Sequence, residues 1–161
     1  MSRRALRTMA TATGLAAALG LAFTAGAAAT GRRPGPQPSA IVSERQAKRV
    51  DSDWGTLYTY YEGESFGTTD GLAAVAVIKP GREIHPPHEH AEEEYLMVLE
   101  GEGTWSLKGQ ERPARAGDMQ YAAPWDVHGI RNTGRAPLRF VVWKWNSRGI
   151  TPPPSPRATP R

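Results

Sequence analysis

The chain of 161 residues contains no cysteine. Disulfide bonds, cysteine-type zinc fingers and iron–sulfur clusters all require cysteine thiols, so the sequence excludes these three ways of stabilising a small fold. Any metal ion must therefore be bound by nitrogen or oxygen atoms. The sequence also shows no internal repeat, and its length fits one domain with additional segments at the ends.

The middle of the chain has few basic residues, although the net charge of the whole sequence is +4. Between Asp51 and Asn146 there are 9 Lys and Arg residues against 15 Asp and Glu residues, which gives this part a net charge of −6. The basic excess lies in the two ends. A nucleic-acid-binding domain needs clustered basic residues on its folded part, so we expect no nucleic acid as a partner.

The N-terminal segment is typical of an export signal. Arg3, Arg4 and Arg7 precede an uncharged stretch from 9 to 29 that is rich in Ala, Leu and Gly. Small residues close this stretch, as signal peptidase requires. We therefore predict a signal peptide over residues 1–29 and a secreted or extracytoplasmic protein with no stable membrane span after cleavage.

Two further interpretations of this segment stay open. A stretch of about 20 apolar residues is long enough for a permanent membrane anchor, but this one is only weakly hydrophobic. The segment Ser2–Arg7, with its paired arginines, also resembles the twin-arginine export signal. That route would carry the protein across the membrane already folded.

The rest of the chain is divided by its proline content. Residues 30–50 form a predicted linker, 51–147 a predicted β-domain, and 148–161 a Pro-rich tail expected to be disordered. Within the linker, 41–50 fits either a short helix or a first edge strand. Short runs rich in aromatic and β-branched residues, each bounded by Gly, Pro or Asn, predict an all-β sandwich or barrel. The predicted strands are 58–61, 72–78, 95–99, 103–107, 119–122 and 138–145.

The chemistry is concentrated in two histidine-containing segments. His88 and His90 are two residues apart, and Glu94 has the same parity, so alternation along an extended chain directs all three side chains to one face. His128 lies in a second segment and would complete the set if the fold brings that segment alongside.

These two segments closely resemble the paired motifs of the cupin superfamily. In the first motif, His88-x-His90 is followed after three residues by Glu94 and after six more by Gly101. The second motif is represented by Gly117, Pro124, His128 and Asn132. It departs from the family pattern because Asp126 stands where a Gly is usual and the approach to His128 is one residue shorter. The resemblance extends from about residue 72 to 145.

The resemblance implies a single jelly-roll β-barrel with one divalent metal ion bound by His88, His90, Glu94 and His128. Three imidazoles and a carboxylate suit Mn, Fe, Ni, Cu or Zn, and we expect Mn or Fe first. The implied function is that of a metal-dependent enzyme on a small organic molecule, of the dioxygenase, decarboxylase, isomerase or lyase type. The alternative is a barrel that binds a small ligand or a metal ion without catalysis. No separate cofactor is expected, and no catalytic residue beyond the metal ligands can be assigned.

Several nearby residues have two interpretations each. His85 either lines the mouth of the site or is an exposed residue beside a Pro-rich turn, and it joins Glu83 and Tyr121 as a candidate base. Glu92 and Glu93 are interpreted as solvated charges. The large aromatic residues either pack in the core or line a pocket; they are Trp105, Tyr121, Trp125, Trp143 and Trp145. The strand 138–145 is apolar on both faces, which predicts a homodimer contact.

Overall fold

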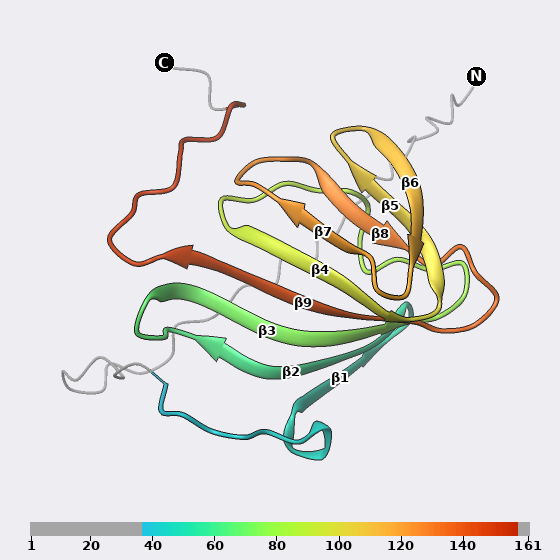
Figure 1. Ribbon diagram of the computed structural model, residues 1–161, viewed down its shortest axis with the longest axis horizontal. Coiled ribbons are helices and arrows are strands. Elements are labelled where there is room, and N and C mark those ends of the chain that lie inside the picture. Colours follow the sequence, from blue (N-terminus) through green and yellow to red (C-terminus); the bar gives the residue numbers. More distant parts are fainter. Residues whose placement is uncertain (1–36, 158–161) are drawn as a thin grey trace, which may run out of the picture. The chain divides into compact units, whose positions relative to one another are not determined.

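The computed structural model describes residues 37–157, so the predicted signal peptide and residues 158–161 lie outside the described part. Nine antiparallel strands and one short 3₁₀ helix make up the regular structure of these residues (Figure 1). The helix η1 spans Glu44–Gln46. The strands are β1 (Lys48–Ser52), β2 (Gly55–Gly63), β3 (Thr68–Ile78), β4 (Glu93–Glu100), β5 (Glu102–Leu107), β6 (Gln110–Arg115), β7 (Met119–Ala122), β8 (His128–Arg131) and β9 (Leu138–Ser147).

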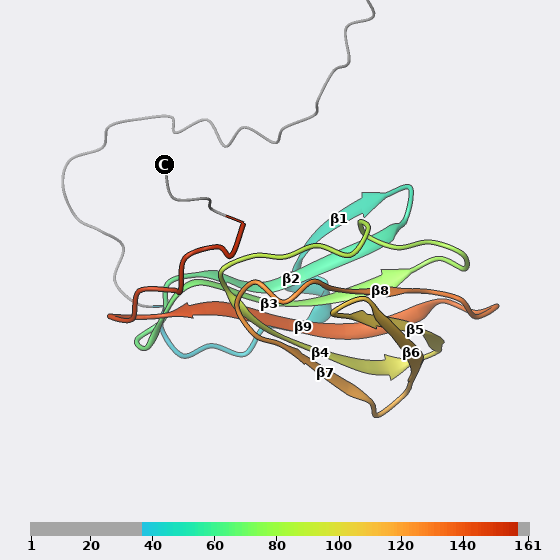
Figure 2. The same cartoon turned by 90° about the horizontal axis from the view of Figure 1, so that it is seen from above.

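The strands form two antiparallel sheets, which confirms the predicted all-β class. The six-stranded sheet has the order β1-β2-β3-β9-β4-β7, and the three-stranded sheet has the order β6-β5-β8. Figure 1 shows β1, β2, β3, β9 and β4 side by side in this order, and Figure 2 shows the same sheet from above. Among the described residues, no helix is long and apolar enough to cross a membrane.

The core lies between the sheets and follows the two-residue alternation of each strand. In β9 the inward side chains are Leu138, Phe140 and Val142, and all three are buried. Val98 of β4 and Ile78 of β3 are fully buried against them. The core is therefore apolar along most of its length, and buried polar groups lie at its ends, Glu94 and His128 at one and Asn132 at the other.

The sequence predicted six of the strands, and the structure extends most of them by a few residues. It missed β6 and β8, whereas the segment 41–50, for which a short helix and a first edge strand were both left open, contains η1 and the start of β1. The sheet begins at Lys48, inside the predicted linker 30–50, because β1 pairs with β2 from Lys48↔Thr59 to Ser52↔Gly55. Strand β6 is mostly polar and contains Pro113, which a strand tolerates at the edge of a sheet.

The connection between β3 and β4 is the part of the fold that positions the candidate site. It runs antiparallel to β8 and is joined to it by isolated bridges at Glu83↔Arg131 and His88↔His128. Asn132, which directly follows β8, is fully buried, and its side-chain amide donates to the carbonyl oxygens of Ile78 and Ala136, both at 2.8 Å. These bonds fix the end of β8 and of the connection relative to β3.

Candidate metal centre

Backbone pairing places His88 beside His128. The amide of His88 donates to the carbonyl of His128 at 3.0 Å, and the amide of His128 donates back to the carbonyl of His88 at 2.9 Å. Such a reciprocal pair aligns the two residues directly across from each other in an antiparallel ladder. The two histidines therefore meet although they are far apart in sequence.

A second backbone contact brings the turn before β8 onto His90. The amide of Trp125 donates to the carbonyl of His90 at 2.8 Å. Trp125 has a φ of 66°, a left-handed conformation that is uncommon for a non-glycine residue. The shortened approach to His128 thus forms a tight turn around Trp125, and His128 keeps its place with only 1% of its surface exposed.

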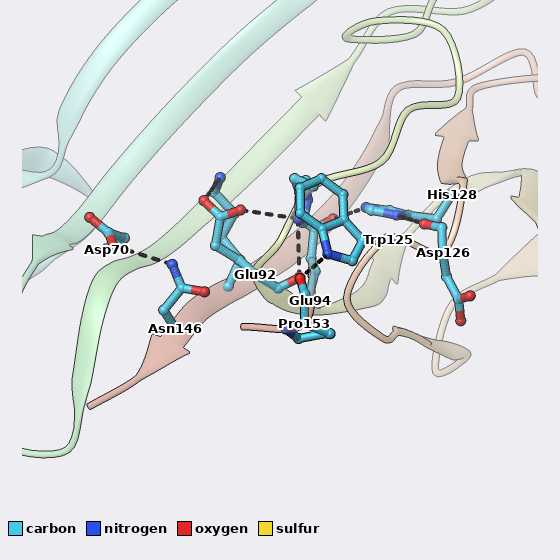
Figure 3. Close-up of polar contacts among 10 residues, drawn as sticks. Asp70, Glu92, Glu94, Trp125, Asp126, His128, Asn146 and Pro153 are labelled. Carbon is cyan, nitrogen blue, oxygen red and sulfur yellow. Dashed lines mark hydrogen bonds and ion pairs between the residues drawn. The ribbon is translucent and has the colours of Figure 1, made fainter. Parts of the chain in front are cut away.

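Three imidazoles and one carboxylate converge where these segments meet β4. One nitrogen from each of His88, His90 and His128 lies within 4.8 Å of the others. Glu94, the second residue of β4, lies between two of the rings: its Oε2 is 3.3 Å from His90 Nε2, and its Oε1 is 3.2 Å from His128 Nε2. Figure 3 shows His128 directed toward Glu94, while the Asp126 carboxylate points away. All four predicted ligand residues are thus brought together.

The outward nitrogens of two of these rings are held by backbone carbonyls. His90 Nδ1 lies 3.1 Å from the carbonyl oxygen of Glu92, and His128 Nδ1 lies 2.8 Å from that of Asp126. A carbonyl accepts a hydrogen bond, so each Nδ1 donates to its carbonyl and each Nε2 faces Glu94; in the neutral ring this Nε2 carries the lone pair that a metal ion needs. Contacts of this kind orient histidines that bind metals.

The donor set fits a divalent ion. Within residues 37–157, His88 Nδ1 is buried and has no hydrogen-bond partner, and the buried His128 Nε2 has only the Glu94 carboxylate near it, at 3.2 Å. Buried polar atoms normally have partners, and a bound cation would satisfy both. Ligand atoms about 2.1 Å from one ion lie roughly 3–4 Å apart, and the three nitrogens, all within 4.8 Å of one another, would reach that spacing by small movements of the rings.

The pKa shifts at the site favour a neutral imidazole at His88 and an ionised carboxylate at Glu94. Burial, together with the positive charge of neighbouring imidazoles, lowers the pKa of His88 to about 4. Burial alone would raise the pKa of Glu94, but hydrogen bonds with His128 and His90 outweigh it and lower the value to about 2. Burial would also lower the pKa of His128, yet the hydrogen bond to Glu94 raises it. His88 is therefore neutral and Glu94 ionised at neutral pH.

A cavity of about 220 Å³ opens beside the four residues. Three of them line it, and most of its remaining surface is apolar; the apolar residues include Leu57, Leu72, Ile84, Leu96, Phe140 and Val142. A larger hollow of about 370 Å³ lies over β5 and β6, but none of the candidate ligands lines it. The apolar cavity with a few convergent polar groups is the expected form of a small-molecule site.

Two functional residues were missed or misjudged from the sequence. Lys144, on β9, lines the cavity, and its Nζ lies 3.2 Å from Glu92 Oε1. Glu92, interpreted as a solvated charge, is mostly buried and also places its Oε2 3.3 Å from His90 Nδ1. Parity carried a signal for both, because Glu92 alternates with His90 and Glu94, and Lys144 alternates with the inward residues of β9.

The other candidate residues are distributed between two faces. His85 lines the cavity, with its ring centroid 3.9 Å from that of His88, which favours the mouth position. Tyr121 pairs with Tyr95 on the outer face of the sheet and donates to Glu93 Oε1 at 2.9 Å, so the suggestion that it acts as a base is wrong. Glu83 pairs with Arg131 and lines a different hollow.

The aromatic residues also take separate places. Trp105 is buried in the core. Trp145 stacks on Tyr95 on the outer face of the sheet, and Trp143 lies on the same face, 39% exposed. Trp125 is the one nearest the candidate ligands through its backbone contact with His90. None of the five lines the cavity, so the pocket interpretation is wrong for this cavity.

Several curated proteins are similar to this chain, and three of them show the range. Protein SchB of Streptomyces halstedii is 30% identical over 109 residues, which cover 62% of this chain and 78% of SchB. Gentisate 1,2-dioxygenase of a Streptomyces species is 28% identical over 82 residues, which cover 50% of this chain and 23% of the enzyme. Dimethylsulfoniopropionate lyase DddQ of Ruegeria pomeroyi is 29% identical over 104 residues, which cover 62% of this chain and 51% of the lyase. The chain thus spans about a quarter of the dioxygenase and about half of the lyase.

Many solved structures share the fold, and two of them illustrate the likeness. An RmlC-like cupin from Shewanella frigidimarina superposes with a TM-score of 0.57 and 19% identity, covering 70% of this chain and 96% of that one. A predicted oxalate decarboxylase from Thermotoga maritima gives a TM-score of 0.53 and 22% identity, covering 66% and 99%. Residues 74–144, which contain all four candidate ligands, match the model of the Cupin domain family. The chain belongs to the cupin superfamily.

Proposed function

We propose that this protein is an exported cupin that binds one divalent metal ion through His88, His90, Glu94 and His128 and acts as a metal-dependent enzyme on a small organic molecule. The observation that carries the proposal is the convergence of three imidazoles on one ionised carboxylate at a cavity, with one buried imidazole nitrogen, His88 Nδ1, left without a partner. We expect Mn or Fe, with Zn, Ni or Cu as further candidates for this donor set.

The ion would supply Lewis-acid or redox chemistry at coordination positions not taken by the protein. The chain's own residues have separate tasks. The carbonyls of Glu92 and Asp126 orient two of the rings, and Glu94 provides the negative charge. The apolar wall, which includes Leu57 and Phe140, holds the substrate body and excludes water. The reaction type is of the dioxygenase, decarboxylase, isomerase or lyase class.

Elemental mass spectrometry tests the proposed metal site. We expect about one divalent ion per chain in the purified protein and loss of that ion from a His88→Ala, His128→Ala double variant. His85→Ala is the matched control, because it removes a neighbouring imidazole that is not a proposed ligand. Equal metal content in the double variant and the parent, or none in either, would contradict the proposal.

The second candidate function is a barrel that binds a small ligand without catalysis. The volume and apolar lining of the cavity favour it as much as they favour an enzyme. Binding of a small organic ligand with the same affinity before and after removal of the metal would support this alternative. Dependence of binding on the ion would support the enzyme.

Export is proposed from the sequence of residues 1–29. N-terminal sequencing of protein recovered outside the cytoplasm tests it, with cleavage expected between Ala27 and Thr30. Replacement of Arg3 and Arg4 by Lys distinguishes the twin-arginine route, which we expect to stop, from the general route, which we expect to continue.

A further inference from the structure

A cation, Lys144, continues the inward-facing row of β9. The inward side chains of β9 are Leu138, Phe140 and Val142, and the next residue of that parity is Lys144. Its cross-strand partners are Leu72 on β3 and Glu94 on β4. Directly paired residues of neighbouring strands share a face and lie in contact range. Lys144 therefore ends the apolar row beside a proposed metal ligand.

The position of Lys144 is partly shielded from water. Its side chain is 28% exposed, and its ammonium group lies 3.2 Å from the carboxylate of Glu92, which is 19% exposed. A lysine rarely turns toward a protein interior unless its charge is paired or used. Glu92 provides one pairing, but the same carboxylate also contacts His90. Lys144 thus shares the Glu92 carboxylate with His90, and it also lines the cavity.

The balance of charges around the cavity favours the binding of one anion once a divalent ion is bound. Glu92, Glu94 and Lys144 together carry a formal charge of −1, and a divalent ion would change it to +1. The other charged groups nearby are already paired, since Asp126 lies 2.9 Å from Lys108 and Glu89 lies 3.0 Å from Arg157. Excess positive charge in a partly dry site favours a negatively charged ligand.

From this arrangement we infer that Lys144 determines substrate class by binding the carboxylate of a small monoanionic substrate whose short apolar body fills the cavity. The inference rests on the proposed metal site. The cavity of about 220 Å³ is smaller than the roughly 300–1,000 Å³ of drug-sized pockets, which limits the substrate to few atoms. The apolar body contacts the wall formed by residues such as Leu57, Leu72 and Val142.

Titration of the cobalt-loaded protein with matched probes tests this inference. The probes are butyrate and benzoate, with butyramide and benzamide as uncharged partners of the same shape. Their dissociation constants are measured by calorimetry for the parent, Lys144→Met, Lys144→Arg and Glu92→Gln. A charge-assisted contact is lost in Lys144→Met, so we expect the carboxylates to bind about tenfold more weakly and the amides to bind unchanged.

The other two variants keep the inference falsifiable. Lys144→Arg preserves the cation and is expected to retain most of the carboxylate affinity. Glu92→Gln removes a competing anion and is expected to tighten carboxylate binding. If Lys144 served only as a structural partner of Glu92, Lys144→Met and Glu92→Gln would each change the affinities for carboxylates and for amides by the same factor. That result would overturn the inference.

Cobalt content separates this failure from failure of the proposed metal site. Protein that binds about one Co²⁺ per chain but shows no dependence of carboxylate affinity on Lys144 disproves only the substrate class. Protein that binds no Co²⁺ disproves the metal site, and with it the basis for an anion between the ion and Lys144.

Discussion

At the residue scale, two opposing influences act on the pKa of His128. It is nearly fully buried, which disfavours the charged imidazolium, yet it lies 3.2 Å from the ionised Glu94, which favours it. The second influence dominates and raises its pKa. His88 has no such partner, and its pKa falls to about 4. His88 is therefore unprotonated and ready to bind a metal near neutral pH, while His128 holds its proton more tightly than an ordinary histidine.

This difference predicts that metal binding weakens in mild acid. A metal displaces the proton from an imidazole, so a ligand with a raised pKa competes with the ion below that pKa. Because the pKa of His128 lies above the ordinary 6.5, we expect affinity to fall as the pH drops, approaching about tenfold for each pH unit well below that pKa. Titration with Mn²⁺ at about pH 7.5, 6.5 and 5.5 measures the trend. Equal affinity at all three values would contradict the assignment.

Spacing placed three of the proposed ligands on one face and the resemblance to the cupin motifs added His128, but the residues around them could not be predicted. The parity of His88, His90 and Glu94 and the motif containing His128 need no knowledge of the fold. Lys144 is different, because a strand pattern shows that it faces inward but not which neighbours it meets. Its role follows from the pairing of β9 with β4, which puts it opposite Glu94.

At the element scale, strands with apolar alternation were predicted and polar ones were missed. The runs in β3, β4 and β9 are fixed by burial on the core face, so their sequence signal is strong. Strand β6 is held by pairing with β5 and buries little except Ala114. Strand β8 has four residues and gains its place from β5 and the connection after β3. When a strand is held mainly by pairing with its neighbours, its own short sequence carries little of the apolar alternation from which a strand is predicted.

The segment after β9 was predicted to be a disordered tail, and residues 148–157 contain no helix or strand. These residues nevertheless contact the barrel near the site. The Trp125 indole donates to the carbonyl of Pro153 at 2.6 Å, and Arg157 pairs with Glu89, between His88 and His90 in the sequence. Figure 3 shows Pro153 beside the Trp125 ring. The segment is therefore attached close to the residues that hold the candidate ligands.

We predict that Trp125→Phe loosens this segment without removing the aromatic ring. The indole hydrogen bond contributes about 1 kcal/mol, so its loss raises the detached population about fivefold. Tryptic cleavage after Arg157 under native conditions, followed by mass spectrometry, measures the effect. Trp143→Phe is the matched control, because Trp143 lies on the outer face of β9. Equal cleavage rates in the two variants would show that the Pro153 contact does not hold the segment.

At the scale of the whole molecule, the candidate centre joins separate parts of the fold. Glu94 belongs to the six-stranded sheet, His128 to the three-stranded sheet, and His88 and His90 to the connection between β3 and β4. A single ion would link all three. The predicted homodimer remains a prediction, and the exposed outer face with Tyr121 and Trp143 is the surface on which it would form.

An ion that links both sheets stabilises the folded state, because the unfolded chain does not hold the four ligands together. Free metal at one hundred times its dissociation constant adds about 2.7 kcal/mol to the free energy of unfolding. For a domain of this size that corresponds to a rise in Tm of roughly 10 °C. We therefore expect chelation to lower Tm by about this amount, measured by calorimetry with and without EDTA. The His128→Ala variant should show no EDTA effect, whereas His85→Ala should retain it. A parent protein whose Tm is unchanged by chelation, although its metal content falls, would mean that the ion does not hold the two sheets together.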